Sequence, residues 1–317
     1  MRSLAIITVA FSTLLGLEMG LQGRDRFPLR LPTHQTRSCP YTAHEDSLLG
    51  YGLKSIGEAE PGQKPELLLV GDSIVAGDGY KDPGQSLVPR LQKALDHQGM
   101  GLHVRGLAVP GYNLSQQLRL LELELQKEHK SRPHGILLTL NAGDADAPFE
   151  LTSDCRLVDA SAGPKERIGI SSVLRFESLR RLLLAKVVLA ANRSGLTAYL
   201  GPQLMGALKP RLSSPRWQQA ASHLNRVKAL ASEREIPIAV LIFPYSAELT
   251  VPPEDNSLAD FLTAFATEQG LPSLRLVDRL AGLGTHEAFL DGNALHLSPI
   301  AYDRVLPDIT RLVDRLK

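Results

Sequence analysis

The sequence has few aromatic residues and no excess of charge of either sign. Phe, Trp and Tyr make up 5% of the 317 residues, and Trp217 is the only tryptophan, which argues against a sugar-binding surface lined with aromatic rings. The 35 basic residues nearly balance the 34 acidic ones, so the chain lacks the positive patch by which proteins bind nucleic acids. With 43% hydrophobic residues it can still form an ordinary globular core. We therefore expect a globular protein without a nucleic-acid partner.

Cysteine is also scarce, with Cys39 and Cys155 as the only two. In an exported protein they could form a disulfide that ties the N-terminal segment to a later loop. The sequence gives no distance between them, so two unrelated buried thiols are an equally good interpretation.

The N-terminal apolar run is shorter than the about 20 residues that a membrane-spanning helix needs. Arg2 precedes the run, which covers residues 4–17, and Glu18 interrupts it before further basic residues. This pattern fits the core of a signal peptide. We expect residues 1–23 to be a signal peptide or an N-terminal membrane anchor, and the protein to be exported: periplasmic, secreted or tethered on the extracytoplasmic side of a membrane.

Two common active-site signatures are absent. The G-x-S-x-G motif of α/β-hydrolases does not occur. No G-x-G-x-x-G motif follows the first expected strand, which argues against a dinucleotide-binding fold.

The chain becomes regular at residue 65, after a segment (24–64) that we interpret as a linker or extended wrap. Short apolar runs bounded by Pro and Gly are typical of buried parallel strands. The expected strands are residues 67–70, 102–107, 136–140, 236–243 and 274–277. The expected helices are residues 84–97, 114–130, 173–192, 215–233, 258–269 and a C-terminal helix from 299. This alternation predicts an α/β domain over residues 65–317, with a parallel sheet covered on both faces.

The loops that follow the strands carry the residues suited to chemistry. Right-handed crossovers place every strand-to-helix loop along one edge of the sheet, and Ser73, Gly111, Asn141 and His296 all fall on such loops. Ser73 is either a nucleophile or a helix N-cap. His296 is either its base or a surface histidine that opens a helix, and Asn141 is either an oxyanion donor or a strand-end cap. A serine, a late histidine and nearby acids together indicate acyl transfer by a serine nucleophile.

Three segments resemble the sequence blocks of the SGNH (GDSL-type) hydrolase family, and the resemblance extends from about residue 46 to the C-terminus. They are Gly71-Asp72-Ser73-Ile74 with Gly77, then Gly106-Leu-Ala-Val-Pro-Gly111-Tyr-Asn113, and His296-Leu-Ser-Pro-Ile-Ala-Tyr302. The resemblance implies a three-layer α/β/α domain with five parallel strands in a flavodoxin-like order. It also implies Ser73 as nucleophile, His296 as catalytic histidine, the amide of Gly111 in the oxyanion hole, and no metal or other cofactor.

Two positions depart from the family pattern. Glycine (Gly143) stands where the third block has an oxyanion-donating asparagine, so Asn141 is the alternative donor, and loss of such a donor typically costs about 10²–10³ in turnover. The family's acid lies three residues before the histidine, but Asn293 occupies that position here. An amide there can hold the wrong histidine tautomer at a cost on the order of 10⁴. We therefore expect Asp291, five residues before the histidine, to act as the acid, with a solvated turn aspartate as the alternative interpretation.

The expected function is an exported serine esterase that hydrolyses a small acyl ester, with a carbohydrate O-acyl group as one candidate substrate. The alternatives are a catalytically impaired binding or assembly protein with the same fold, and an O-acyltransferase that uses the same residues. Asp144 and Asp146 suggest a hydrated loop rather than a cation site, since no His or Glu accompanies them.

Overall fold

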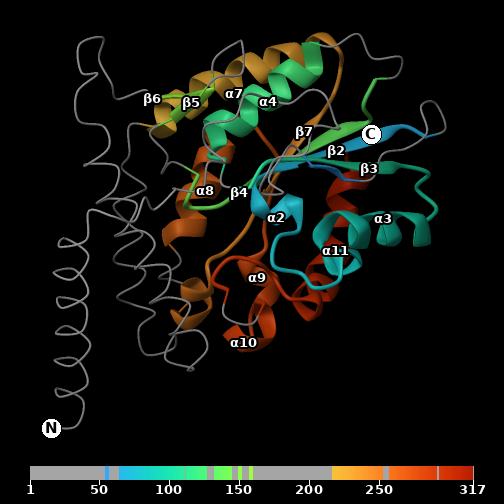
Figure 1. Cartoon of the computed structure of the whole chain (residues 1–317), viewed down its shortest axis with the longest axis vertical. Helices are drawn as coiled ribbons and strands as arrows, with labels where there is room; N and C mark the ends of the chain where they lie inside the picture. Colours follow the sequence, from blue (N-terminus) through green and yellow to red (C-terminus); the bar gives the residue numbers. More distant parts are fainter. Residues whose placement is uncertain are drawn as a thin grey trace, which may run out of the picture. The chain divides into compact units, whose positions relative to one another are not determined.

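A six-stranded sheet organises the computed structural model of the protein (Figure 1). The structure describes residues 54–56, 64–110, 112–126, 132–144, 149–151, 157–159, 216–252, 257–290 and 293–316. The strands of this sheet are β1 (Lys54–Ile56), β2 (Glu66–Gly71), β3 (His103–Ala108), β4 (Gly135–Leu140), β7 (Ile238–Ile242) and β8 (Ser273–Arg275). Their spatial order is β1-β3-β2-β4-β7-β8.

Five of these strands are parallel, and they are the five that the sequence predicts. Parallel pairing joins β2 to β3 and β4, β4 to β7, and β7 to β8, whereas β1 lies antiparallel to β3 at the edge. The parallel order β3-β2-β4-β7-β8 is the flavodoxin-like arrangement, in which ligands bind beyond the carboxyl ends of the strands. The expected five-stranded parallel sheet is therefore confirmed, and the short strand β1 was not predicted.

Side chains on alternate residues of each strand divide the core into two layers. Leu68 and Val70 of β2 pack in one hydrophobic cluster, while Leu67 and Leu69 pack in the other. All four are fully buried, which explains why this strand appears in the sequence as a continuous apolar run.

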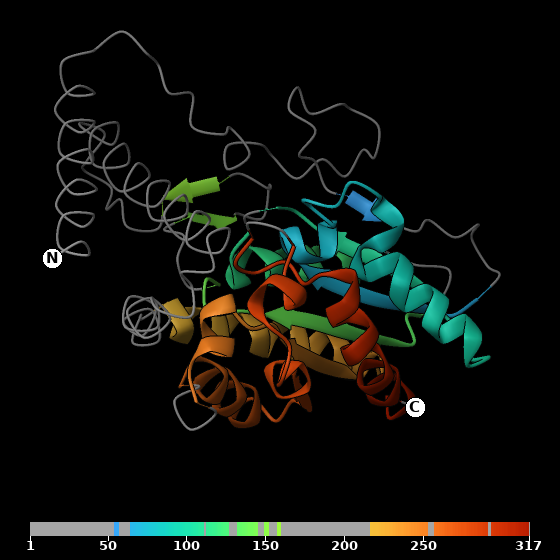
Figure 2. The same ribbon diagram turned by 90° about the horizontal axis from the view of Figure 1, so that it is seen from below.

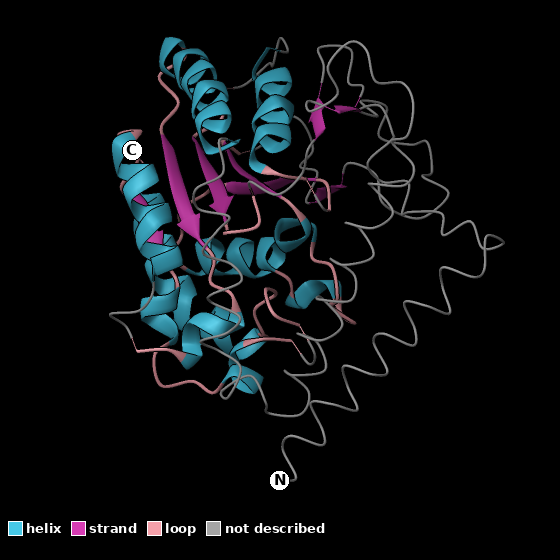
Figure 3. Ribbon diagram, turned by 90° about the vertical axis from the view of Figure 1, so that its left-hand side faces the viewer, coloured by secondary structure: helices cyan, strands magenta, loops and turns pink. Residues whose placement is uncertain are grey.

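Helices cover both faces of the sheet, as a three-layer α/β/α fold requires (Figure 3). One cluster includes residues of α4 (Leu114–Gln126), α7 (Arg216–Glu233) and α8 (Ser257–Glu268). The other includes residues of α2 (Ser73–Ala76), α3 (Leu87–His97), α9 (Val277–Leu280) and α11 (Pro299–Asp314). Figure 2, seen from below, shows α3 and α11 in front of the strands. Each layer thus buries the apolar face of its helices against one side of the same strands.

Several element boundaries differ from those expected. Helix α3 begins at Leu87 instead of residue 84, because the 3-10 turn η2 (Pro83–Gln85) precedes it and Ser86 is extended. Strand β8 ends at Arg275, since Val277 begins α9. The antiparallel pair β5 (Phe149–Leu151) and β6 (Leu157–Asp159) and the short helix α10 (Thr285–Ala288) were not predicted. The expected helix over residues 173–192 lies outside the described residues.

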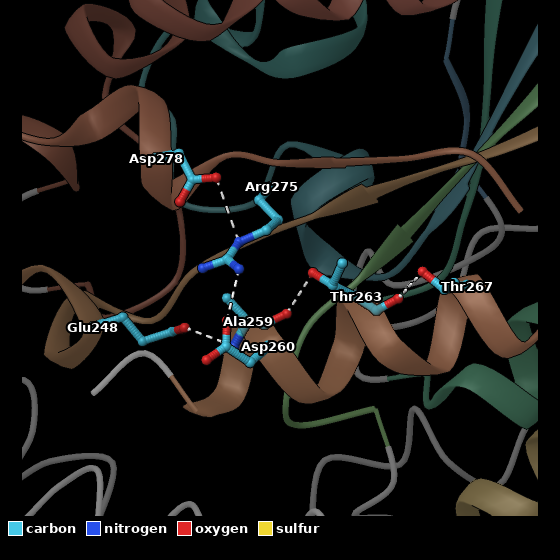
Figure 4. Close-up of polar contacts among 7 residues, drawn as sticks. All are labelled: Glu248, Ala259, Asp260, Thr263, Thr267, Arg275 and Asp278. Atoms are coloured by element: carbon cyan, nitrogen blue, oxygen red, sulfur yellow. Dashed lines mark hydrogen bonds and ion pairs between the residues drawn. The ribbon is translucent and has the colours of Figure 1, made fainter. Parts of the chain in front are cut away.

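The loops beyond β7 and β8 are held to α8 by polar contacts (Figure 4). The side chain of Glu248, in the 3-10 helix η4 (Ser246–Thr250), accepts hydrogen bonds from the backbone N–H of Tyr245 and of Ala259, at 2.8 and 3.1 Å. Arg275, at the end of β8, forms ion pairs with Asp260 of α8 and with Asp278 of α9. Glu248 therefore joins the start of η4 to the start of α8.

The N-terminal expectations concern residues that the structure does not describe. These are the signal peptide or anchor (1–23), most of the linker segment (24–64) and the pairing of Cys39 with Cys155. Within the part of the chain that is described, no helix combines the length and apolar character needed to cross a membrane.

Candidate active site

Ser73 is the first residue of α2, directly beyond the carboxyl end of β2. The N-cap of this helix is Asp72, whose Oδ1 accepts a hydrogen bond from the backbone N–H of Ile74 at 2.9 Å. The alternative interpretation of Ser73 as the N-cap is therefore wrong, because the preceding aspartate takes that position. The Ser73 hydroxyl contacts a distant part of the chain instead.

Gly71 shows why the turn before Ser73 needs a residue without a side chain. A Cβ at this position would lie 2.2 Å from Oγ1 of Thr139 on β4 and 2.5 Å from Cγ2 of Val75. Both distances are far below van der Waals contact, so only glycine lets the turn pack directly on the neighbouring strand and on α2.

Ser73 and His296 meet across 223 residues of sequence. Oγ of Ser73 lies 2.8 Å from Nε2 of His296. The histidine precedes α11, whose N-cap Ser298 accepts a hydrogen bond from the N–H of Ala301, and the Tyr80 hydroxyl donates to the carbonyl of Leu297. The chain directly after His296 is thus fixed, and His296 itself is only 8% exposed.

The other ring nitrogen of His296 faces an amide side chain. Nδ2 of Asn293 lies 3.2 Å from Nδ1 of His296. Oδ1 of Asn293 accepts hydrogen bonds from the backbone N–H of Leu295 and of His296, both at 2.8 Å. Since this oxygen is held by two donors, the amide cannot rotate to present it to the ring without losing both bonds. Asp291 lies outside the described residues, so its expected contact with His296 stays a prediction.

Burial sets the protonation of His296. It lowers the pKa of the imidazole below its usual value, because the buried charged form loses hydration, while the charge and backbone carbonyl of Asp78 act in the opposite direction. The neutral imidazole, which is the form that can accept a proton from Ser73, is therefore favoured near neutral pH.

Asn141, at the end of β4, is connected to the nucleophile turn through Asp72. Its Nδ2 donates to Oδ2 of Asp72 at 3.3 Å, and its Oδ1 accepts from the N–H of Gly143 at 2.8 Å. One of the two amide hydrogens is thus directed to Asp72, which leaves the second for another acceptor. Burial raises the pKa of Asp72 to about 6, although its hydrogen bonds with Ile74 and Asn141 favour the carboxylate. Asn141 thus contacts the residue that precedes Ser73, and its role as an oxyanion donor stays a prediction.

Asp144 does not lie in a hydrated loop, contrary to expectation. It is 3% exposed, and its carboxylate accepts hydrogen bonds from the backbone N–H of Asn141 at 2.6 Å and from Nε2 of Gln117 at 2.9 Å. The carbonyl of Asp144 also accepts from the N–H of Leu114 at 3.0 Å. A lone aspartate in a polar stretch gives no sign of this, because Gln117 of α4 lies 27 residues away in sequence. Asp144 therefore joins the loop after β4 to the start of α4, and Asp146 lies outside the described residues.

Two residues near the site were missed by sequence reasoning. Asp72 has a recognisable signal, since an aspartate directly before a helix is a typical N-cap. Asp78 follows the left-handed C-cap Gly77 of α2, and its charge and backbone hydrogen bond raise the pKa of His296. No sequence pattern indicates this effect.

Gly111, the expected oxyanion glycine, is not among the described residues. The described residues contain no cluster of three or more acidic, histidine or cysteine side chains suited to a metal.

The fold and the site together define a three-layer α/β/α protein with a hydrogen-bonded serine–histidine pair beyond the carboxyl ends of its parallel strands. Among solved structures the chain is similar to TesA, with 18% sequence identity and a TM-score of 0.46 over 80% of this chain and 99% of that chain. It is similar to AlinE4, an SGNH-hydrolase family esterase, with 14% identity and a TM-score of 0.41 over 81% of this chain and 98% of that chain. It is also similar to a carbohydrate acetylesterase family member from Sinorhizobium meliloti, with 13% identity and a TM-score of 0.40 over 79% and 99% of the respective chains. No family model matches the chain, and no curated protein matches its sequence. The activity proposed below therefore rests on the contacts of Ser73 and His296.

Proposed function

We propose that the protein is a serine esterase that hydrolyses small acyl esters, with Ser73 as nucleophile and His296 as general base. The observation that carries this proposal is the 2.8 Å contact between Oγ of Ser73 and Nε2 of His296. A serine hydroxyl is a weak nucleophile until a base within hydrogen-bond reach accepts its proton, and a neutral buried imidazole is such a base.

The reaction proceeds in two halves. Oγ of Ser73 attacks the ester carbonyl carbon while its proton passes to Nε2 of His296, and the tetrahedral intermediate collapses as Nε2 returns that proton to the leaving alcohol. Water then attacks the acyl-enzyme with His296 again as base, and the carboxylic acid and free Ser73 are released. No cofactor takes part in these steps. The amides of Ser73 and Gly111, with Nδ2 of Asn141, are the proposed donors to the oxyanion.

The proposed substrate class is a small acyl ester, and the O-acyl group of a carbohydrate is one candidate within that class. The N-terminal apolar run supports an extracytoplasmic location for this reaction. Fractionation of cells that produce the full chain tests the location, since recovery in the cytosolic fraction alone would contradict it.

Hydrolysis of p-nitrophenyl acetate and butyrate by the full chain tests the activity. We expect Ser73→Ala to abolish hydrolysis, and a fluorophosphonate to label Ser73 covalently, as shown by peptide mass spectrometry. Ser232→Ala, at an exposed position in α7, is the matched control and should keep the native rate. Equal rates for the native protein and Ser73→Ala would reject the mechanism.

One observation favours a second candidate, the non-catalytic binding protein. It is the amide of Asn293 beside Nδ1 of His296, where a carboxylate would orient and charge-stabilise the ring. This candidate predicts no fluorophosphonate labelling and no turnover of any ester, together with carbohydrate binding that survives Ser73→Ala. Acyl transfer to an added glycan that is faster than hydrolysis would instead identify an O-acyltransferase.

A further inference from the structure

The turn that follows α2 lies against the Nδ1 side of the His296 ring. Gly77 ends the helix in the left-handed conformation, with φ of 75°, and the N–H of Asp78 donates to the carbonyl of Ser73 at 3.1 Å. Gly79 is also left-handed, with φ of 85°, and a Cβ built on it would lie 3.5 Å from Nδ1 of His296. The backbone of this turn is therefore hydrogen-bonded to the nucleophile residue at one end and lies near Nδ1 of its base at the other.

Asn293 cannot supply what a catalytic histidine needs at Nδ1. Its oxygen is held by two backbone N–H groups, so it presents only N–H donors to the ring. A donor at Nδ1 favours the tautomer in which the proton sits on Nε2, and this tautomer cannot accept the proton of Ser73. An acceptor from elsewhere is required if Nδ1 is to carry the proton.

We propose that Asp78 is the positioning residue of His296: its backbone carbonyl accepts the Nδ1–H, and its carboxylate stabilises the imidazolium that forms when Nε2 takes the proton of Ser73. This inference rests on the proposed function and adds to it a group that accepts the Nδ1–H, which the side chain of Asn293 cannot do. Asp78 holds the ring in the tautomer that leaves Nε2 free for Ser73.

The electrostatics of the site agree with this role. Both the charge of Asp78 and its backbone hydrogen bond raise the pKa of His296, against the larger effect of burial. Among the described residues, the side chains of Ser73 and Asn293, which contact the two ring nitrogens, are uncharged. Asp72 contacts Asn141 instead. Within the part of the chain that the structure describes, Asp78 is thus the residue whose negative charge acts on the His296 ring.

The first experiment removes the charge and keeps the backbone. In the full chain, Asp78→Asn should lower kcat for p-nitrophenyl acetate about tenfold or more with KM unchanged, since a poorer base affects the chemical step rather than binding. It should also move the acid limb of the pH profile to lower pH. Asp96→Asn, which removes the same charge from an exposed position on α3, is the control and should leave both unchanged.

A double-mutant cycle separates positioning from mere structural support. Asn293→Asp places a carboxylate at Nδ1, so Asp78→Asn should cost little in that background. An equal loss in both backgrounds would overturn the proposal, because a purely structural defect does not depend on residue 293. A large loss in Asp291→Asn with none in Asp78→Asn would overturn it as well, and would assign the role to Asp291.

The ring nitrogens of His296 can be followed by NMR without any substrate. Asp78→Asn should lower the pKa of His296 by a measurable fraction of a unit or more, and Asp96→Asn should not change it. An unchanged pKa in Asp78→Asn would reject the proposal even for an active enzyme. A lowered pKa in a chain that hydrolyses no ester would support the contact between Asp78 and His296 while rejecting the esterase function.

Discussion

Nδ2 of Asn293 lies 3.2 Å from Nδ1 of His296, on the ring nitrogen opposite to the one that contacts Ser73. The amide oxygen of the same side chain accepts two backbone N–H groups and thereby shapes the histidine loop. Asn293 therefore stabilises the loop, but it offers Nδ1 of His296 only a hydrogen-bond donor and no negative charge.

Asn293→Asp should increase kcat/KM for p-nitrophenyl acetate about tenfold or more, because a carboxylate next to Nδ1 stabilises the imidazolium, which the neutral amide of Asn293 does not. One carboxylate oxygen can still accept the two backbone N–H groups. The measurement is steady-state kinetics at pH 7.5, with Asn293→Ala as the control that loses the loop contacts and should be less active than the native protein. An unchanged rate in Asn293→Asp would show that the native site already has a full substitute for the acid.

The acid limb of the pH profile should lie below the usual histidine value of 6.5, because burial lowers the pKa of His296. The active form of the base is neutral, so a lowered pKa preserves activity at lower pH. The test is the dependence of kcat/KM on pH between 4.5 and 8. Because the pKa of Asp72 is raised to about 6, the profile of Asp72→Asn should be recorded too, and an acid limb that disappears in this variant would assign the limb to Asp72.

Two variants of Asp72 should separate its two contacts. Asp72→Ala removes the N-cap of α2 and should lower the free energy of unfolding at pH 7 by about 1–2 kcal/mol. Asp72→Asn keeps an oxygen that accepts from the N–H of Ile74 but places an NH2 group against the NH2 group of Asn141, so it loses only the second contact. This variant should therefore be more stable than Asp72→Ala. Urea unfolding followed by circular dichroism measures both. Equal destabilisation by the two variants would contradict the capping role.

Glu248 should make the protein less stable as the pH rises from about 4.5 to 7. Burial raises the pKa of its carboxyl from 4.5 to about 7, so in this window the folded state binds more protons than the unfolded state, and the free energy of unfolding falls with pH. The full shift corresponds to roughly 3 kcal/mol, an order-of-magnitude figure. Urea unfolding at pH 5 and pH 8 should show a smaller difference for Glu248→Gln than for the native protein. Glu233→Gln, at an exposed position in α7, should show the same difference in free energy of unfolding between pH 5 and pH 8 as the native protein. The same difference in Glu248→Gln would disprove the attribution of this pH dependence to Glu248.

The sequence by itself determined the sheet and the loops that carry the site. The run Leu67–Leu68–Leu69–Val70 is apolar on both faces, and such a run has few alternatives to a buried parallel strand. Right-handed crossovers then place Ser73 and the residues after the other strands at one edge without any knowledge of side-chain contacts. This much follows from local periodicity and chain chirality.

Only the tertiary structure decided which groups contact one another at that edge. In the structure Asp72 is the N-cap of α2, and Asp144 is buried against α4. Asn293 and the turn that follows α2 both lie near Nδ1 of His296. These contacts join residues from different elements, and their geometry depends on how the loops pack rather than on any pattern within one segment. The packing of these loops decides which group accepts the hydrogen bond from Nδ1–H, and no local sequence signal carries such information.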